Sequence, residues 1–146
     1  MSSMMMHGVE MTVFLDSNVV LYALGNDSGK RTIACALLVE KPTISTQVVN
    51  ECSHVLRRKL RYSPAEAGKA LTAVIKAVKL TDVGIQETYA AWALAARYAY
   101  SHFDSLIIAT ALNAGCTTLY SEDMQHGQVI GGRLTIINPF LPDNGL

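Results

Sequence analysis

The fold is indicated most strongly by one stretch of the chain, HFDSLIIATAL at residues 102–112. Its apolar residues surround nearly the whole circumference of a helix, and a helix that is apolar all round is buried. We therefore predict a buried helix over Asp104–Ala114 that ends before Gly115, since glycine commonly follows the last helical residue. This prediction places the carboxylate of Asp104 at the N-terminal end of the helix.

Strand and helix signals alternate on both sides of this stretch. Short β-rich runs predict strands at Thr12–Leu15, Pro42–Ser45, Leu80–Val83, Cys116–Tyr120 and Leu134–Ile137. Helical spacing and helix boundaries predict helices at Val19–Leu24, Lys30–Glu40, Thr46–Arg61, Pro64–Val78 and Ile85–Tyr100. Strands separated by helices form a mostly parallel sheet, so we predict a three-layer α/β domain with about five strands and helices on both faces.

Length and composition agree with one folded domain. The chain has 146 residues, of which 50% are hydrophobic and 16% charged, and its formal charge is zero. Disordered chains combine low hydrophobicity with high net charge, so that class is excluded. We expect a disordered extension over residues 1–10, which lack the features of a signal peptide, and a single domain over residues 11–146.

Two function classes can be set aside from the same composition. No apolar run reaches the roughly 18–20 residues that cross a bilayer, so we expect no membrane partner. The cysteines Cys35, Cys52 and Cys116 are odd in number and widely spaced. Such cysteines favour reduced thiols in the core of a cytoplasmic protein over a disulfide framework or a thiolate zinc site.

Four acidic residues from distant parts of the chain fall where this topology gathers its loops. They are Asp16, Glu51, Asp104 and Asp123. Each has an ordinary explanation by itself, as a helix cap, a turn residue or part of a solvated helix face. Together they lie at the carboxyl ends of the strands, where such folds bind ligands. Carboxylates that meet there repel one another unless a hard divalent cation lies between them.

The sequence resembles the PIN-domain family, and within it the VapC-like toxins of toxin–antitoxin pairs. The resemblance spans Met11 to Phe140 and depends on five blocks in order: FLDSNVVLYAL, QVVNE, HFDSLIIATAL, YSEDMQHG and TIINPF. The first four blocks supply the family's acidic positions through the same four acids, and Ser121 takes its small-hydroxyl position. Glu122 is an alternative to Asp123 as a ligand.

This resemblance implies a Mg²⁺- or Mn²⁺-dependent endoribonuclease that holds one or two ions. The implied metal ligands are Asp16, Asp104 and Asp123, and Glu51 would act on the metal or position the attacking water. The residues that would orient these carboxylates are Ser17, Asn18 and Ser121. The implied partners are an RNA substrate, a cognate antitoxin and a second copy of the chain in a homodimer.

Basic side chains are concentrated in one part of the chain, so a neutral total does not exclude a nucleic-acid partner. Residues 57–79 carry seven Lys or Arg residues and one acid, Glu66. If the predicted helix is regular to its end, Arg58 and Arg61 lie on the same stripe as Glu51 and could contact RNA phosphates. Basic residues in a last turn also complement the helix dipole, and both interpretations stay open.

Two other functions remain open from the sequence. A haloacid-dehalogenase-like phosphatase also uses a strand-end aspartate, but it requires a second acid two residues later, where this chain has Asn18. A non-catalytic PIN-like domain that only binds a partner is opposed by the complete acidic set. Among the remaining residues, we expect His54 to be structural, and Tyr89 and Trp92 to lie in the core or in a subunit interface.

Overall fold

Six strands form one sheet in the order β5-β4-β3-β6-β8-β7 in this computed structural model, which describes residues 5–6, 9–10 and 12–142. The strands are β3 (Val13–Leu15), β4 (Thr43–Ser45), β5 (Lys79–Thr81), β6 (Thr118–Tyr120), β7 (Val129–Ile130) and β8 (Leu134–Ile137). Neighbouring strands run parallel except for β7 and β8. The predicted α/β fold with a mostly parallel sheet is therefore confirmed.

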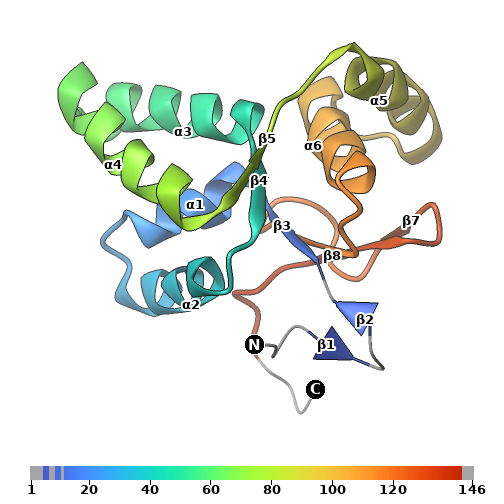
Figure 1. Ribbon diagram of the computed structural model, residues 1–146, viewed down its shortest axis with the longest axis horizontal. Helices are drawn as coiled ribbons and strands as arrows, with labels where there is room; N and C mark the ends of the chain where they lie inside the picture. The colour runs from blue at the N-terminus through green and yellow to red at the C-terminus, as the bar shows by residue number, and fades with distance from the viewer. Residues whose placement is uncertain (1–4, 7–8, 11, 143–146) are drawn as a thin grey trace.

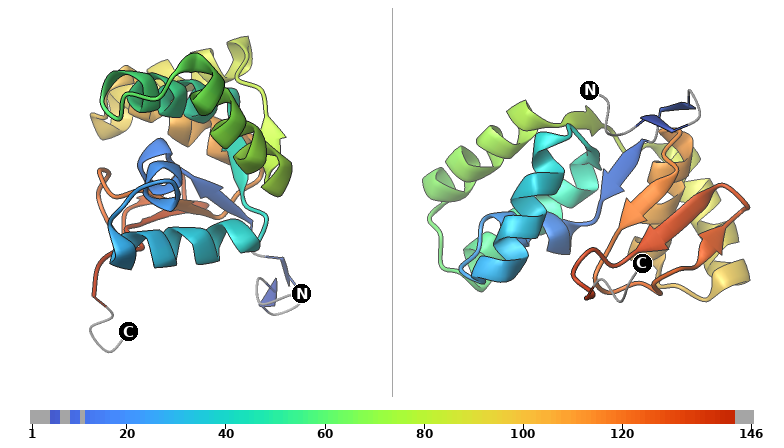
Figure 2. Two further views of the ribbon diagram at one scale, coloured as in Figure 1. Left: turned by 90° about the vertical axis from the view of Figure 1, so that its left-hand side faces the viewer. Right: turned by 90° about the horizontal axis from the view of Figure 1, so that it is seen from below.

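Helices connect the strands and cover both faces of the sheet. They are α1 (Ser17–Ala23), α2 (Ser28–Val39), α3 (Thr46–Arg58), α4 (Pro64–Ala77), α5 (Ile85–Tyr98) and α6 (His102–Asn113). Figure 1 shows two helix pairs, α3–α4 and α5–α6, standing apart on the same side of the molecule. Figure 2 shows α2 on the opposite side of the sheet from α5 and α6, which gives the three layers.

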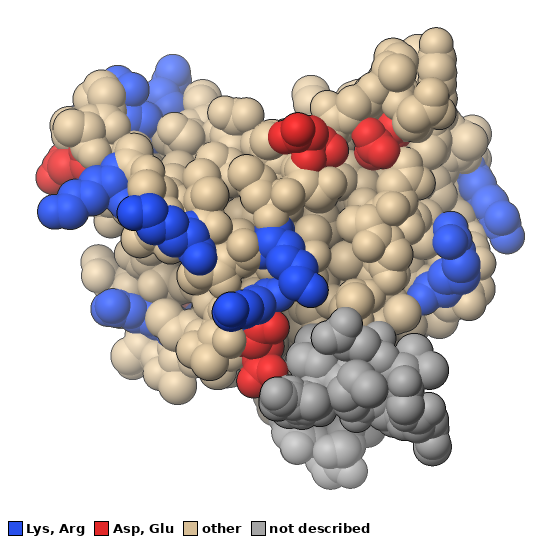
Figure 3. Space-filling view, viewed as in Figure 1, with Lys and Arg blue, Asp and Glu red and all other residues tan. Residues whose placement is uncertain are grey.

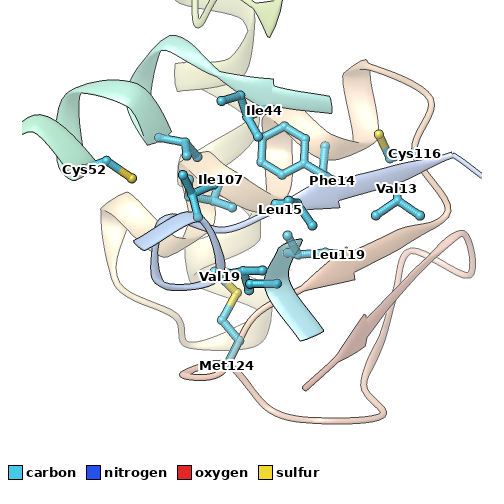
Figure 4. Packing of buried hydrophobic residues seen from close by; sticks show 14 of the residues in the cluster. Val13, Phe14, Leu15, Val19, Ile44, Cys52, Ile107, Cys116, Leu119 and Met124 are labelled. Atoms are coloured by element: carbon cyan, nitrogen blue, oxygen red, sulfur yellow. The ribbon is translucent and has the colours of Figure 1, made fainter. Parts of the chain in front are cut away.

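The core is centred on β3 and α6. Phe14 and Leu15 of β3 have no exposed surface, and α6 is buried continuously over residues 105–111. Figure 4 shows Phe14 among neighbouring core side chains that include Ile44 and Ile107. Burying a side chain of this size contributes roughly 1.5–3 kcal/mol. The prediction of a helix buried on all sides is confirmed.

The first turn of α6 differs from the sequence prediction. The helix begins at His102, because the Ser101 hydroxyl accepts a hydrogen bond from the Asp104 backbone N–H (3.1 Å) and caps the helix. The prediction that Asp104 starts the helix was therefore wrong. Asp104 lies instead within the first turn, where a carboxylate interacts favourably with the helix dipole.

The end of α3 also differs from the prediction. The helix ends at Arg58, and the backbone of Arg61 adopts a left-handed conformation with φ of 62°. The Tyr62 backbone N–H donates to the Leu56 carbonyl (2.9 Å), so the chain turns back on the helix end. The prediction that Arg61 continues the helical stripe of Glu51 was therefore wrong.

Strand β7 was not predicted from the sequence. It has two residues and pairs with β8 across a turn in which Gly131 and Gly132 have φ of 58° and 68°. Glycine adopts this left-handed conformation without the steric cost that other residues incur. The glycine pair was the signal in the sequence for this turn.

The remaining expectations concern the N-terminus, the cysteines and the membrane. Much of the extension expected to be disordered over residues 1–10 lies outside the described residues, and within it β1 (Met5–Met6) pairs antiparallel with β2 (Val9–Glu10). Cys52 and Cys116 are buried free thiols as expected, but Cys35 is exposed. In the described part of the chain, no helix is both long enough and apolar enough to cross a membrane.

Candidate active site

Asp16 lies where β3 meets α1 and is the most buried of the four acids. It is only 5% exposed and acts as the N-cap of α1, accepting a hydrogen bond from the Ser17 backbone N–H (2.7 Å). The Ser121 hydroxyl donates to its other oxygen (2.8 Å). Burial raises the pKa of Asp16 to about 6, and repulsion from Asp104 and Glu51 adds to the rise against these hydrogen bonds.

The loop that follows β6 brings Asp123 to Asp16. Ser121 is fully buried, and its hydroxyl oxygen accepts the backbone N–H groups of Asp123 (3.3 Å) and Met124 (3.2 Å). The Asn18 amide nitrogen lies 3.2 Å from Asp123 Oδ2 and 3.4 Å from Asp16 Oδ2, so it donates between the two carboxylates. Ser121 and Asn18 thus hold the two acids in fixed relation, as predicted for residues that orient a carboxylate set.

Glu122 is directed away from Asp123 and toward a separate cluster. It forms an ion pair with Lys30 and accepts a hydrogen bond from the Tyr22 hydroxyl (2.6 Å). Lys30 also lies over the rings of Tyr22 and Phe140, 4.5 and 5.5 Å from their centroids. Burial raises the pKa of Glu122, but the bonds from Lys30 and Tyr22 outweigh it and hold the pKa below its usual value. Because Glu122 is engaged there, Asp123 is the acid of this loop that faces the other carboxylates.

Glu51 reaches the site from α3 and is held by a neighbour one turn earlier. The Gln47 amide nitrogen donates to Glu51 Oε2 (3.0 Å) and also to the Phe103 carbonyl (3.1 Å). This one amide therefore connects α3 to the first turn of α6. The other amide atom, Gln47 Oε1, is buried and has no hydrogen-bond partner among the described residues.

Asp104 faces the other carboxylates from the first turn of α6. Partial burial raises its pKa, and the nearby charges of Asp123 and Glu51 raise it further. Without a bound cation, the ionised forms of Asp104 and Asp16 are therefore less favourable in the folded protein than in water. Mutual repulsion of this kind is relieved when a cation binds between the carboxylates.

The four acids line one cavity of about 630 Å³, whose walls come from the start of α1, from α3, from the first turn of α6 and from the loop after β6. Its lining consists of Asp16, Ser17, Asn18, Gln47, Asn50, Glu51, His54, Val55, Phe103, Asp104 and Asp123. The structure thus brings together all four predicted acids with Ser17 and Asn18, while Ser121 lies behind Asp16. No Lys or Arg of the described residues lines this cavity.

Arg58 and Arg61 are exposed and lie outside the cavity lining. Figure 3 shows Lys and Arg side chains gathered at the end of the molecule formed by α3 and α4. The Lys and Arg residues concentrated in residues 57–79 therefore contribute to a basic surface at this end of the molecule. The role of Arg58 and Arg61 in RNA binding stays a prediction.

The donor chemistry of the cavity suits a hard divalent cation. Its charged lining groups are carboxylates, and oxygen ligands are the ones that Mg²⁺ and Mn²⁺ prefer. However, no group of three Asp, Glu, His or Cys side chains among the described residues is arranged to hold an ion by itself. Mg²⁺ keeps several of its waters and uses only one or two carboxylates, so this more open arrangement fits an ion bound partly through water.

Several polar and aromatic residues of the cavity were not predicted from the sequence. Gln47 lies four residues before Glu51, so helical spacing was a usable signal for its position. His54 was expected to be a partly exposed structural residue; it is exposed and lines the cavity beside Asn50, and its role stays a prediction. Phe103 gave no signal, since an apolar residue next to a buried helix is normally assigned to the core.

Comparison with known proteins identifies the family to which this fold belongs. A model of the family described as PIN domain matches residues 13–130. No protein of curated function matches the chain.

Solved structures with the same fold include several toxins. The sarcin–ricin-loop-cleaving toxin VapC20 of Mycobacterium tuberculosis is 21% identical, with a TM-score of 0.62 over 77% of this chain and 90% of that chain. A toxin–antitoxin complex from Klebsiella pneumoniae is 14% identical, with a TM-score of 0.66 over 88% and 98% of the two chains. VapBC2 from Rickettsia felis, bound to a DNA fragment from its promoter, is 18% identical, with a TM-score of 0.65 over 86% and 97%. At these identities the likeness is one of fold.

Proposed function

The chain belongs to the PIN-domain family, and on that basis we propose that it is a Mg²⁺- or Mn²⁺-dependent endoribonuclease that hydrolyses RNA phosphodiester bonds. The observation that carries this proposal is the meeting of Asp16, Glu51, Asp104 and Asp123 around one cavity. The raised pKa values of Asp16 and Asp104 support it: burial is the main cause, the neighbouring carboxylates add to the rise, and no Lys or Arg among the described lining residues offsets it.

The four acids have two different roles in the proposed reaction. Asp16, Asp104 and Asp123 would hold one or two ions, directly or through coordinated water. When bound, such an ion polarises the phosphodiester and lowers the pKa of a coordinated water. Glu51 has one oxygen occupied by Gln47 and its other oxygen without a bond to any described residue, which suits it to orient the attacking water.

The neighbouring polar groups would keep these acids in place. Ser121 and the Ser17 backbone fix the two oxygens of Asp16, and Asn18 connects Asp16 to Asp123. An ordered set of carboxylates would hold the ions in fixed positions. Less rearrangement of the site would then be required when negative charge develops on the leaving oxygen. The haloacid-dehalogenase-like alternative loses support here, because Asn18 occupies the position of the second acid and serves as a hydrogen-bond donor.

The test compares RNA cleavage by the wild-type protein and the variant Asp104→Asn. We expect the wild type to cleave a mixture of transfer, ribosomal and messenger RNA with Mg²⁺ or Mn²⁺ but not with EDTA, and Asp104→Asn to lose at least about 100-fold in rate. Asp82→Asn is the matched control, since Asp82 is exposed and lies outside the cavity. Metal-dependent cleavage by purified Asp104→Asn at the wild-type rate would contradict the proposal.

The same experiment separates the alternatives. Hydrolysis of a small phosphomonoester without RNA cleavage would favour a phosphatase. A protein whose melting temperature does not respond to Mn²⁺ and which cleaves neither substrate would favour a non-catalytic PIN domain that binds a partner.

We also propose that the protein is the toxin of a toxin–antitoxin pair and is inhibited by a cognate antitoxin. The solved complexes that share its fold include a toxin–antitoxin complex from Klebsiella pneumoniae and VapBC from Salmonella typhimurium, which support this partner class. Co-expression with the product of the adjacent upstream gene should give a stable complex that lacks RNase activity. Light scattering of the protein alone would test the proposed homodimer, for which we expect about twice the chain mass of 15.8 kDa.

A further inference from the structure

One aromatic side chain, Phe103, lines the cavity beside the carboxylates, and we propose that it is the stacking platform for an unpaired nucleobase next to the scissile phosphate. The inference rests on the proposed ribonuclease function and adds a substrate-positioning residue to it.

The exposure of Phe103 is unusual for its position. It directly precedes Asp104, yet it is 61% exposed and belongs to neither of the hydrophobic clusters formed by the described residues. Its ring contacts His102 edge to face, with the centroids 5.2 Å apart. A nucleobase stacked on this ring would remove apolar surface from water, and such stacking accepts any base because every base has an aromatic face.

The position of Phe103 is fixed relative to the acids. Its carbonyl accepts a hydrogen bond from Gln47, and the same Gln47 amide binds Glu51. The backbone of Phe103 is therefore tied through Gln47 to a carboxylate on α3, and it directly precedes Asp104 in the first turn of α6. A base held on Phe103 would have its own phosphate group close to the proposed hydrolytic site.

The charge of the cavity favours a neutral contact of this kind. Its lining contains carboxylates and no Lys or Arg among the described residues. Without a bound ion, the lining side chains offer RNA phosphates no favourable electrostatic contact. Binding affinity near the site therefore has to come from the ion and from contacts to uncharged bases. Stacking on an aromatic ring provides such a contact.

Polar groups on α3 are available to contact the edges of a stacked base. Asn50 uses its amide nitrogen on the Thr46 carbonyl (3.0 Å), which leaves its oxygen as an acceptor. The exposed His54 ring makes no hydrogen bond to a described residue. Gln47 Oε1 is a buried acceptor without a partner, a kind of group that a bound molecule or water commonly satisfies.

An RNA occupant fits this wall of the cavity better than a docked protein. Protein interfaces have a core of contiguous apolar residues, whereas Val55 is the other large apolar residue in the described lining. A paired base in a duplex is already stacked on both faces, so only an unpaired nucleotide can offer a face to Phe103.

The test uses the variants Phe103→Ala and Phe103→Tyr with two RNAs of the same cleavage-site sequence, one in a hairpin loop and one in a full duplex. We expect Phe103→Ala to raise KM for the hairpin about 5-fold or more with little change in kcat. Phe103→Tyr, which keeps an aromatic ring, should have a KM close to that of the wild type. Trp92→Ala is the matched control, because Trp92 is 58% exposed but lies outside the cavity. It should leave KM unchanged.

Binding measured without cleavage separates this inference from the proposed function. Fluorescence anisotropy of the labelled hairpin, in an Asp104→Asn background, should show the same weakening by Phe103→Ala even if the wild type proves to have no nuclease activity. Equal losses for hairpin and duplex, or no loss for either, would overturn the stacking role. Unchanged RNA binding together with loss of antitoxin binding would assign Phe103 to a protein interface and would also overturn it.

Discussion

Asp16 gives the sharpest prediction, because burial forces its charge into an unfavourable environment. The substitution Asp16→Asn keeps the side-chain shape and the N-cap, since Asn caps helices about as well as Asp. The Ser17 backbone can still donate to the remaining oxygen, but the Ser121 hydroxyl and the Asn18 amide lose the oxygen to which they donate. The substitution therefore removes the charge together with these hydrogen bonds, and the loss of the hydrogen bonds does not depend on pH.

The magnitude follows from the pKa of Asp16. The rise from 3.8 to about 6 on folding corresponds to about 3 kcal/mol, since each pKa unit is worth about 1.4 kcal/mol. The folded protein binds this proton more tightly than the unfolded chain does, so the stability contributed by the neutral carboxyl is complete below pH 4 and is lost as the pH rises through about 6. The stability of metal-free Asp16→Asn relative to the wild type should thus rise by up to about 3 kcal/mol between pH 4 and pH 8.

The assay is urea unfolding in EDTA at a series of pH values between 4 and 8, followed by circular dichroism. Asp27→Asn is the control, because Asp27 is also an N-cap, on α2, but is exposed. The control should show no comparable gain in the free energy of unfolding. A difference in stability between Asp16→Asn and the wild type that does not change between pH 4 and pH 8, or that changes in favour of the wild type as the pH rises, would refute the reasoning.

Two further predictions concern residues around the site. Replacing Arg58 and Arg61 together by Ala should weaken RNA binding and reduce the slope of log Kd against log salt concentration by about 1 to 2, and an unchanged slope would contradict a phosphate contact. Lys30→Met should lower the free energy of unfolding only slightly, because it removes the ion pair with Glu122 but that pair is partly exposed and screened by solvent. Lys69→Met, on an exposed part of α4, should have no such effect on urea unfolding.

The fold could be predicted largely from the sequence because its signals are local and repeated. The alternation of β-rich runs with helices indicated a parallel sheet, and the apolar character of α6 indicated burial on all sides. Element ends were harder to predict. Ser101 and Asp104 are both good helix-capping residues, and only the hydrogen bond between them decides that Ser101 is the cap. Similarly, nothing in the sequence around Arg61 marks a left-handed backbone.

The four acids of the site could be identified because strand ends in this topology converge on one edge. Exposure and side-chain direction were not predictable, since they depend on which neighbours fill the space. Tyr89 and Trp92 were expected in the core or in a subunit interface. Both are more than half exposed in the single chain, which excludes the core, and the interface stays a prediction. Glu122 and Asp123 are adjacent and chemically equivalent in the sequence. The ion pair with Lys30, which lies 92 residues away, directs Glu122 elsewhere.

Under the proposed function, the zero net charge of the chain is the sum of two surfaces that would act on RNA in different ways. The basic end formed by α3 and α4 would attract phosphates over a distance, and that attraction would be screened within about 10 Å at 0.1 M salt. The cavity contains carboxylates and no cationic side chain of the described residues, so it repels phosphates until a divalent ion binds. Stacking on Phe103 depends little on salt. As the salt concentration rises, the effect of Arg58→Ala with Arg61→Ala should therefore fade while that of Phe103→Ala persists, which separates the surface that attracts RNA from the cavity that positions it.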